Sequence, residues 1–108
     1  MSIEPTPVAE RTEKYWPKLN QVIDPEINLG VVDLGLIYNV NLDSRGLATV
    51  RMTLTSPACP FGPTLVQQVQ DKMLMYPGVT DVEMQIVWDP VWTEEMIDPE
   101  LRDFMMGI

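Results

Sequence analysis

The segment from Thr53 to Pro63 (TLTSPACPFGP) constrains the fold most, because an alternating apolar pattern stops there and a helical pattern begins. Its prolines and glycine leave the backbone few conformations, which favours a tight strand-to-helix connection. It also holds the single cysteine, Cys59. A thiol at a helix entrance lies near the positive end of the helix dipole, which favours the thiolate. The alternative is that Cys59 is a small buried apolar residue, as free cysteines most often are.

The composition limits the location and the chemistry of the chain. With 108 residues, it is long enough for one domain that folds without disulfides or metals. One cysteine excludes an internal disulfide, so we expect a reducing, cytoplasmic location. A net charge of −9 without a basic cluster argues against nucleic acid and anionic membranes as partners, and no stretch has the length of a membrane span. The absence of histidine excludes Ser-His and Cys-His nucleophile pairs and histidine-based zinc sites.

The periodicity predicts one α+β domain over residues 12–108, after a mobile N-terminal tail over residues 1–11. The order helix–strand–strand–helix–strand–helix predicts two layers, with helices against one face of a three-stranded mixed sheet. The expected helices span about 14–23, 63–76 and 98–107, and the expected strands about 36–42, 47–55 and 81–88. The strand residues expected to face the core are Leu36, Tyr38, Val40, Leu42, Ala48, Val50, Met52, Leu54, Val82, Met84, Ile86 and Trp88.

Several loops carry side chains suited to chemistry, and the hairpin between the first two strands should bring these loops to one end of the sheet. The candidate residues are Asp24, Glu26, Asp33, Thr55, Ser56, Cys59 and Asp89. The aspartates have an ordinary alternative, which is hydrogen bonding to the backbone of a turn, and Thr55 and Ser56 are also common turn residues. Trp88 and Trp92 are predicted to cover the seam between helices and sheet rather than to act as stacking platforms.

One thiolate with a few carboxylates does not make a closed metal site. Structural zinc and iron–sulfur clusters usually need four protein ligands, mostly thiolates or imidazoles. No tightly bound cofactor is therefore expected. Cys59 could hold iron or an iron–sulfur cluster only transiently, shared across a homodimer or with ligands from a partner. Carboxylates near the thiol would oppose the helix dipole by disfavouring the thiolate.

Four motifs occur together in a known family: Asp24–Ile27 (DPEI), Val32–Tyr38 (VDLGLIY), Thr53–Pro60 (TLTSPACP) and Trp88–Trp92 (WDPVW). In their order and spacing the chain resembles the SufT/PaaD-like family of metal–sulfur cluster biosynthesis proteins. The resemblance implies a compact α+β fold and an accessory role in the SUF system of iron–sulfur protein maturation. It implies that the motif cysteine is essential and that the surface around Asp24, Glu26, Thr55, Ser56 and Cys59 is the functional one.

Two departures from the family pattern refine this expectation. The phenylacetate-pathway branch carries an additional cysteine-rich segment, whereas no cysteine follows Cys59 here, so the stand-alone SufT-like branch is favoured. The last motif has Val91 where the family commonly has a second proline, a change that we expect to be tolerated.

Three functions remain open from the sequence. The first is a non-enzymatic factor that assembles or transfers iron–sulfur clusters through Cys59, with the assembly machinery and apo-client proteins as partners. The second is a hydrolase or transferase in which Cys59 works with Asp24 or Glu26, which requires the thiol within about 3 Å of the base. The third is an interaction module whose acidic face, including Asp81 and Glu83, binds a partner without thiol chemistry.

Overall fold

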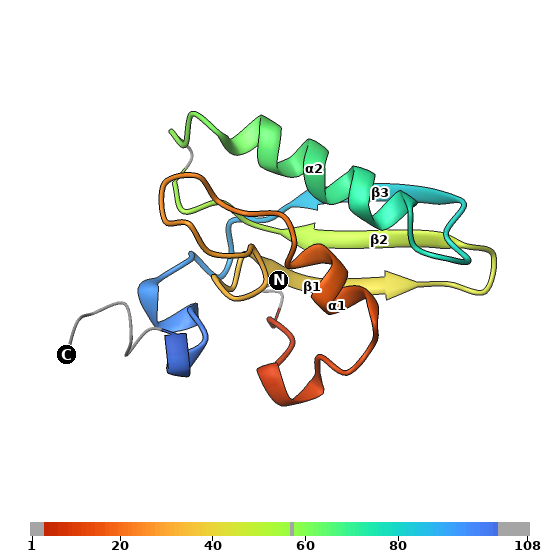
Figure 1. Ribbon diagram of the computed structural model, residues 1–108, viewed down its shortest axis with the longest axis horizontal. Helices are drawn as coiled ribbons and strands as arrows, with labels where there is room; N and C mark the ends of the chain where they lie inside the picture. Colours follow the sequence, from red (N-terminus) through yellow and green to blue (C-terminus); the bar gives the residue numbers. More distant parts are fainter. Residues whose placement is uncertain (1–3, 57, 102–108) are drawn as a thin grey trace.

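The computed structural model of the protein describes residues 4–56 and 58–101. The sheet has the order β1-β2-β3, with β1 (Ile37–Leu42) antiparallel to β2 (Leu47–Met52) and β2 parallel to β3 (Asp81–Ile86). The helices α1 (Tyr15–Leu19) and α2 (Gly62–Leu74) pack against each other and cover one face of this sheet (Figure 1). This confirms the predicted two-layer α+β fold with a mixed three-stranded sheet.

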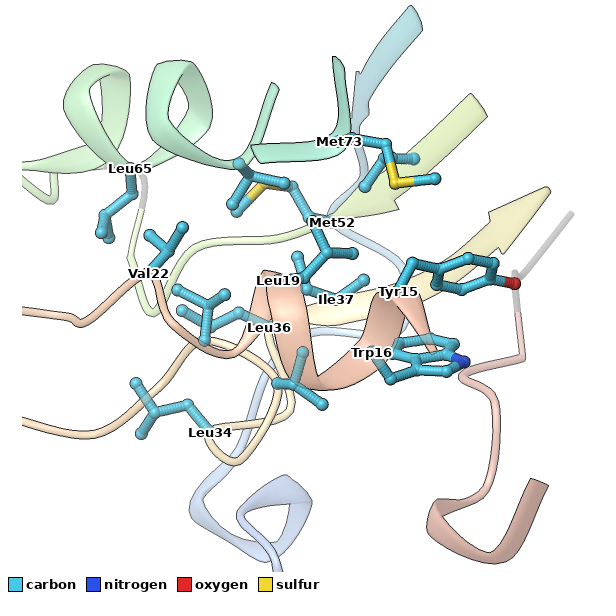
Figure 2. Close-up of a cluster of buried hydrophobic side chains, with 14 of the residues drawn as sticks. Tyr15, Trp16, Leu19, Val22, Leu34, Leu36, Ile37, Met52, Leu65 and Met73 are labelled. Atoms are coloured by element: carbon cyan, nitrogen blue, oxygen red, sulfur yellow. The ribbon is translucent and has the colours of Figure 1, made fainter. Parts of the chain in front are cut away.

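The core lies between the two helices and the covered face of the sheet (Figure 2). Leu19 of α1, Met52 of β2 and Met73 of α2 are completely buried. The predicted apolar stripe of α2 is correct, since Leu65 and Val69 share the core with Met73. The inward face of β2 is correct as well, because Ala48, Val50 and Met52 are all buried.

A bulge in β1 changes which side chains face the core. Ile37 pairs with Met52, but the next pair is Asn39 with Arg51, so the register shifts around Tyr38. An extra residue in one strand interrupts the alternation of its side chains. Ile37 therefore joins the core cluster, and Tyr38 instead donates its hydroxyl proton to the carbonyl oxygen of Pro90, 2.7 Å away. Tyr38 is completely buried but lies outside the core cluster that contains Leu36, so the prediction that it shares one face with Leu36, Val40 and Leu42 was wrong.

The strands and helices are shorter than their sequence patterns. The alternation of β3 ends at Ile86, and the backbone N–H of Val87 donates to the carbonyl of Met52 at 2.9 Å. Ile86 and Trp88 are 37% and 43% exposed, so their predicted inward placement was wrong. Ile86 lies in an edge strand, and Trp88 follows the end of that strand, where the pleat no longer fixes its direction. Helix α1 ends at Leu19, and the side chain of the next residue, Asn20, accepts hydrogen bonds from Val32 and Asp33.

The segment expected to be a tail makes specific contacts with the domain. It contains a 3-10 helix, η1 (Val8–Glu10), and the N–H of Thr6 donates to the carbonyl of Tyr38 at 2.8 Å. The guanidinium of Arg11 lies over the ring of Trp16, 5.4 Å from its centroid. A second 3-10 helix, η2 (Glu94–Met96), precedes a helical turn at 99–101, and the remainder of the predicted last helix lies outside the described residues. No helix within the described ranges is long and apolar enough to cross a membrane.

Candidate functional site

The loop between β2 and α2 holds Cys59 in a series of tight turns. The N–H of Cys59 donates to the carbonyl of Ser56 at 3.1 Å, and the N–H of Gly62 donates to the carbonyl of Cys59 at 3.2 Å. The hydroxyl of Ser56 accepts from the N–H of Ala58 at 3.1 Å. Ser56 therefore acts here as a turn residue, the ordinary alternative considered for it, and the loop presents the thiol just before the first turn of α2.

The start of α2 is anchored closely against the end of β2. Gly62 is buried, and a Cβ there would come within 2.7 Å of a methyl group of Leu54. Only glycine allows this close approach without a shift of Leu54. Phe61, which precedes Gly62, remains 40% exposed. The start of α2 therefore lies in close contact with the side chain of Leu54, which follows β2.

The thiol of Cys59 is free and partly exposed, and a carboxylate lies beside it. The Sγ atom of Cys59 is 4.0 Å from Oε1 of Glu26, a residue 33 positions earlier in the chain. Both side chains reach solvent, so a second molecule can approach the pair. The thiol is not sealed in the core, and the alternative of a fully buried apolar cysteine does not apply.

Asp24 has a different place from Glu26, although the two residues are neighbours in the same motif. Its side chain is only 3% exposed, and its Oδ1 accepts hydrogen bonds from the N–H groups of Glu26 at 2.8 Å and Ile27 at 3.2 Å. The carbonyl of Asp24 accepts from the N–H of Asn28 at 2.7 Å. Asp24 therefore organises the turn that carries Glu26, as expected for an aspartate in its turn-forming role.

Asp33 is held on the α1 side of its loop. Its Oδ2 accepts from the side-chain amide of Asn20 at 2.9 Å, and its carbonyl accepts from the N–H of Asp98 at 2.8 Å. It lines a pocket of about 260 Å³ together with Arg11, Trp16 and Asp98. Burial lowers the pKa of Arg11, while Asp98 and Asp33 act in the opposite direction. The contacts given for Asp33 are therefore with Asn20 and Asp98. The side chain in contact with the thiol of Cys59 is Glu26.

Sequence reasoning missed Asn20, which ties α1 to the loop that carries the candidate carboxylates. Its Oδ1 accepts from the N–H groups of Val32 and Asp33 at 3.0 and 2.9 Å. Gly30 packs so closely on this amide that a Cβ would overlap it. An asparagine at the end of a predicted helix has many uses, so the sequence carried no specific signal for this one.

The two tryptophans of the last motif behave differently. Trp92 is partly buried against the core, and its indole N–H donates to the carbonyl of Leu34 at 2.8 Å, while its placement over the seam between helices and sheet stays a prediction. Trp88 is 43% exposed and does not show the predicted covering role. Thr55 is partly exposed and Asp89 is exposed, while Pro57 lies outside the described residues.

The geometry bears on the chemistry that the pair could perform. Across the part of the chain that the structure describes, no three or more Cys, Asp or Glu side chains gather in a manner that could hold a metal ion. Cys59 and Glu26 together offer two ligands, fewer than the four that an iron–sulfur cluster usually takes. The 4.0 Å between thiol and carboxylate exceeds the separation of about 3 Å expected of a nucleophile and its base. Asp24 accepts two backbone hydrogen bonds and is buried, so it is not placed as a base for the thiol.

Comparison with known proteins gives consistent results. The family described as "Iron-sulfur cluster assembly protein" matches residues 16–85. The chain is 49% identical over 76 residues to the Fe-S protein maturation auxiliary factor SufT of Staphylococcus aureus, covering 70% of this chain and 86% of that protein. It is 46% identical over 83 residues to the auxiliary factor YitW of Bacillus subtilis, covering 77% and 81% of the two chains.

A solved structure supports the same assignment. The crystal structure of a domain of unknown function, DUF59, from Bacillus anthracis superimposes with a TM-score of 0.80 at 34% identity, covering 88% of this chain and 90% of that one. Sequence and fold agree over most of the chain, and the matched region includes Glu26 and Cys59. The chain therefore belongs to the iron–sulfur cluster assembly protein family.

Proposed function

We propose that this protein is an accessory factor that assists the assembly of iron–sulfur clusters or their transfer to client proteins, and that Cys59 is its reactive group. The observation that carries the proposal is the partly exposed thiol, which lies in a hydrogen-bonded turn 4.0 Å from the carboxylate of Glu26. The family membership supplies the context of iron–sulfur assembly. The relatives named as maturation auxiliary factors support a non-enzymatic role.

The incomplete ligand set supports a transient and shared mode of binding. One thiolate and one carboxylate can contact iron, but they leave coordination positions for sulfide and for ligands from another molecule. That molecule is an assembly protein, an apo-client or a second copy of this chain. In this scheme the cluster is cargo, and weak retention is useful because the cargo must leave.

The carboxylate also suits a cationic cargo. Iron ions and the iron atoms of a cluster carry positive charge, so Glu26 attracts them towards the sulfur of Cys59. The thiolate is the form of cysteine that binds metal. The pair therefore provides a soft ligand, the thiolate of Cys59, and a hard ligand, the carboxylate of Glu26, from two different loops.

Anaerobic reconstitution with iron and sulfide tests this proposal. The wild-type protein should gain visible absorbance and bound iron, and Cys59→Ser should lose both. Asp43→Ala serves as a matched control, because Asp43 organises a turn in the hairpin between β1 and β2, away from the thiol. Equal iron and sulfide content in wild type and Cys59→Ser would remove the thiol from the mechanism and favour an interaction module without thiol chemistry.

A further inference from the structure

Glu26 lies in a turn whose two ends are joined by backbone hydrogen bonds. The N–H of Asp24 donates to the carbonyl of Leu29 at 2.9 Å, and Ile23 bridges to Gly30, so the base of the turn is paired. Asn28 closes the turn with a φ of 65°, a conformation that asparagine tolerates better than most residues. The turn is therefore a defined element and not an open loop.

The buried carboxylate of Asp24 is the internal support of this turn. With 3% exposure, it accepts from two consecutive N–H groups, those of Glu26 and Ile27. Without that acceptor, both N–H groups would lose a charge-assisted hydrogen bond, and the φ and ψ angles of Glu26 would no longer be set. The direction of the Glu26 side chain towards Cys59 depends on those angles.

We propose that Asp24 is a positioning residue that holds the carboxylate of Glu26 against Cys59, and that this carboxylate makes the thiol select cationic and neutral reactants over anionic ones. The inference deepens the proposed function and rests on Cys59 being the reactive group. It assigns different tasks to two carboxylates of one motif. Glu26 faces the incoming molecule, and Asp24 acts only through Glu26.

A selectivity of this kind has a use in a protein that passes iron or clusters. An exposed thiolate can attack an anionic disulfide and release half of it as a thiolate, and the mixed disulfide that remains on Cys59 would block it. A fixed negative charge near the sulfur slows the approach of such molecules and favours that of a metal cation. The expected discrimination is about threefold at low salt for a charge some 6 Å away, and it shrinks as salt is added.

The rates of alkylation by iodoacetate and iodoacetamide measure this selectivity directly. In both reactions the sulfur forms a bond to carbon and iodide leaves, but only iodoacetate carries a negative charge. The ratio of the two rates cancels the fraction of thiolate and the general accessibility of the sulfur. We expect Glu26→Gln to raise the iodoacetate-to-iodoacetamide ratio about two- to threefold at low ionic strength.

Variants of Asp24 separate positioning from charge. Asp24→Ala removes the acceptor and should raise the ratio towards that of Glu26→Gln. Asp24→Asn keeps the side-chain oxygen as an acceptor without the charge, and should leave the ratio close to that of the wild type. Asp43→Ala is the matched control, because Asp43 accepts from the N–H groups of Arg45 and Leu47 in a turn of another loop, and its ratio should not change.

The outcomes decide between this inference and its rivals. A wild-type ratio in folded Asp24→Ala would overturn it, and so would an equal rise in Asp24→Asn and Asp24→Ala, which would assign the effect to the charge of Asp24. If Asp24→Ala does not fold, Asp24→Ser replaces it, since serine offers a shorter and weaker acceptor. An intermediate ratio is then expected, and an unchanged one contradicts the proposal. The alkylation rates do not involve iron. This inference can therefore fail while the role of Cys59 in cluster assembly stands, and that role can fail while the selectivity of the thiol is observed.

Discussion

The sulfur of Cys59 lies 4.0 Å from the carboxylate of Glu26. Glu26 belongs to the loop that precedes β1, and Cys59 belongs to the loop that follows β2. The relationship depends on the anchoring of both loops. Gly62 packs on Leu54 in the segment that carries Cys59, and the side chain of Asp24 accepts from the N–H of Glu26. The pair of Cys59 and Glu26 thus lies outside the hydrophobic core, and substitutions can change the pair and the core separately.

Core and site substitutions should affect stability differently. Leu19→Ala removes a completely buried side chain and should lower the free energy of unfolding by about 2–5 kcal/mol. Cys59→Ser changes one partly exposed atom and should shift it by less than about 0.5 kcal/mol. Urea unfolding, monitored by tryptophan fluorescence, measures the free energy of unfolding of both variants and of the wild type. A loss above about 2 kcal/mol in Cys59→Ser would show that the thiol is a structural residue.

The Asn20 amide should contribute strongly to stability. Asn20→Ala leaves the N–H groups of Val32 and Asp33 without their acceptor, and we expect a loss of about 2–4 kcal/mol. Asn41→Ala is a matched control because Asn41 is exposed on β1, and its effect should stay within about 0.5 kcal/mol. Similar urea midpoints for the two variants would argue against the bridging role of Asn20.

Two glycines with positive φ give a test of the packing around the 31–35 loop. Gly78 has a φ of 91° and open space at its Cβ position, so Gly78→Ala should cost about 1–2 kcal/mol from backbone strain alone. Gly35 has a φ of 77°, and a Cβ there would overlap the carbonyl of Met96. Gly35→Ala should therefore cost a further 1–3 kcal/mol or so, the usual penalty for overpacking. Equal losses in thermal unfolding would mean that the contact with Met96 is absent in solution.

Tyr15 should make stability fall at high pH. Burial raises the pKa of Tyr15 from 10.0 to about 12, and Glu13 and Tyr76 add to the shift. Because the folded state favours the neutral phenol, this contribution is complete below pH 10 and is lost as the pH rises towards 12. The free energy of unfolding of the wild type should therefore fall more steeply over this range than that of Tyr15→Phe. If the free energy of unfolding fell equally with pH in the wild type and in Tyr15→Phe, Tyr15 would not be the source of the pH dependence.

The sequence was sufficient for the architecture because the apolar periods of α2 and β2 agree with their burial. Leu65, Val69 and Met73 recur at helical spacing, and Ala48, Val50 and Met52 alternate, and all six are buried. The facing of Tyr38 could not be predicted in this way. The apolar pattern of 36–42 gives no sign of a bulge at Tyr38, which interrupts the alternation, so Leu36 and Ile37 both join the core cluster while Tyr38 is buried outside it.

The arrangement of the candidate residues in space was predicted in part, for a similar reason. The hairpin between the first two strands predicted that the candidate loops meet at one end of the sheet, and Glu26 lies 4.0 Å from Cys59. The sequence could not separate the roles of Asp24 and Glu26, since both are acidic residues of one loop. Burial separates them, because Asp24 is enclosed by its own turn. The hydrogen bond between Asn20 and Asp33 joins residues 13 positions apart, and no periodic pattern encodes such a contact.

The most direct test of the central claim measures the activity of an iron–sulfur enzyme in a strain that lacks this protein. Wild-type protein should restore that activity, as should Asp43→Ala, whereas Cys59→Ser at equal abundance should leave it at the level of the deletion strain. Full restoration by Cys59→Ser would contradict the account, because the thiol would then not be the group through which the protein acts.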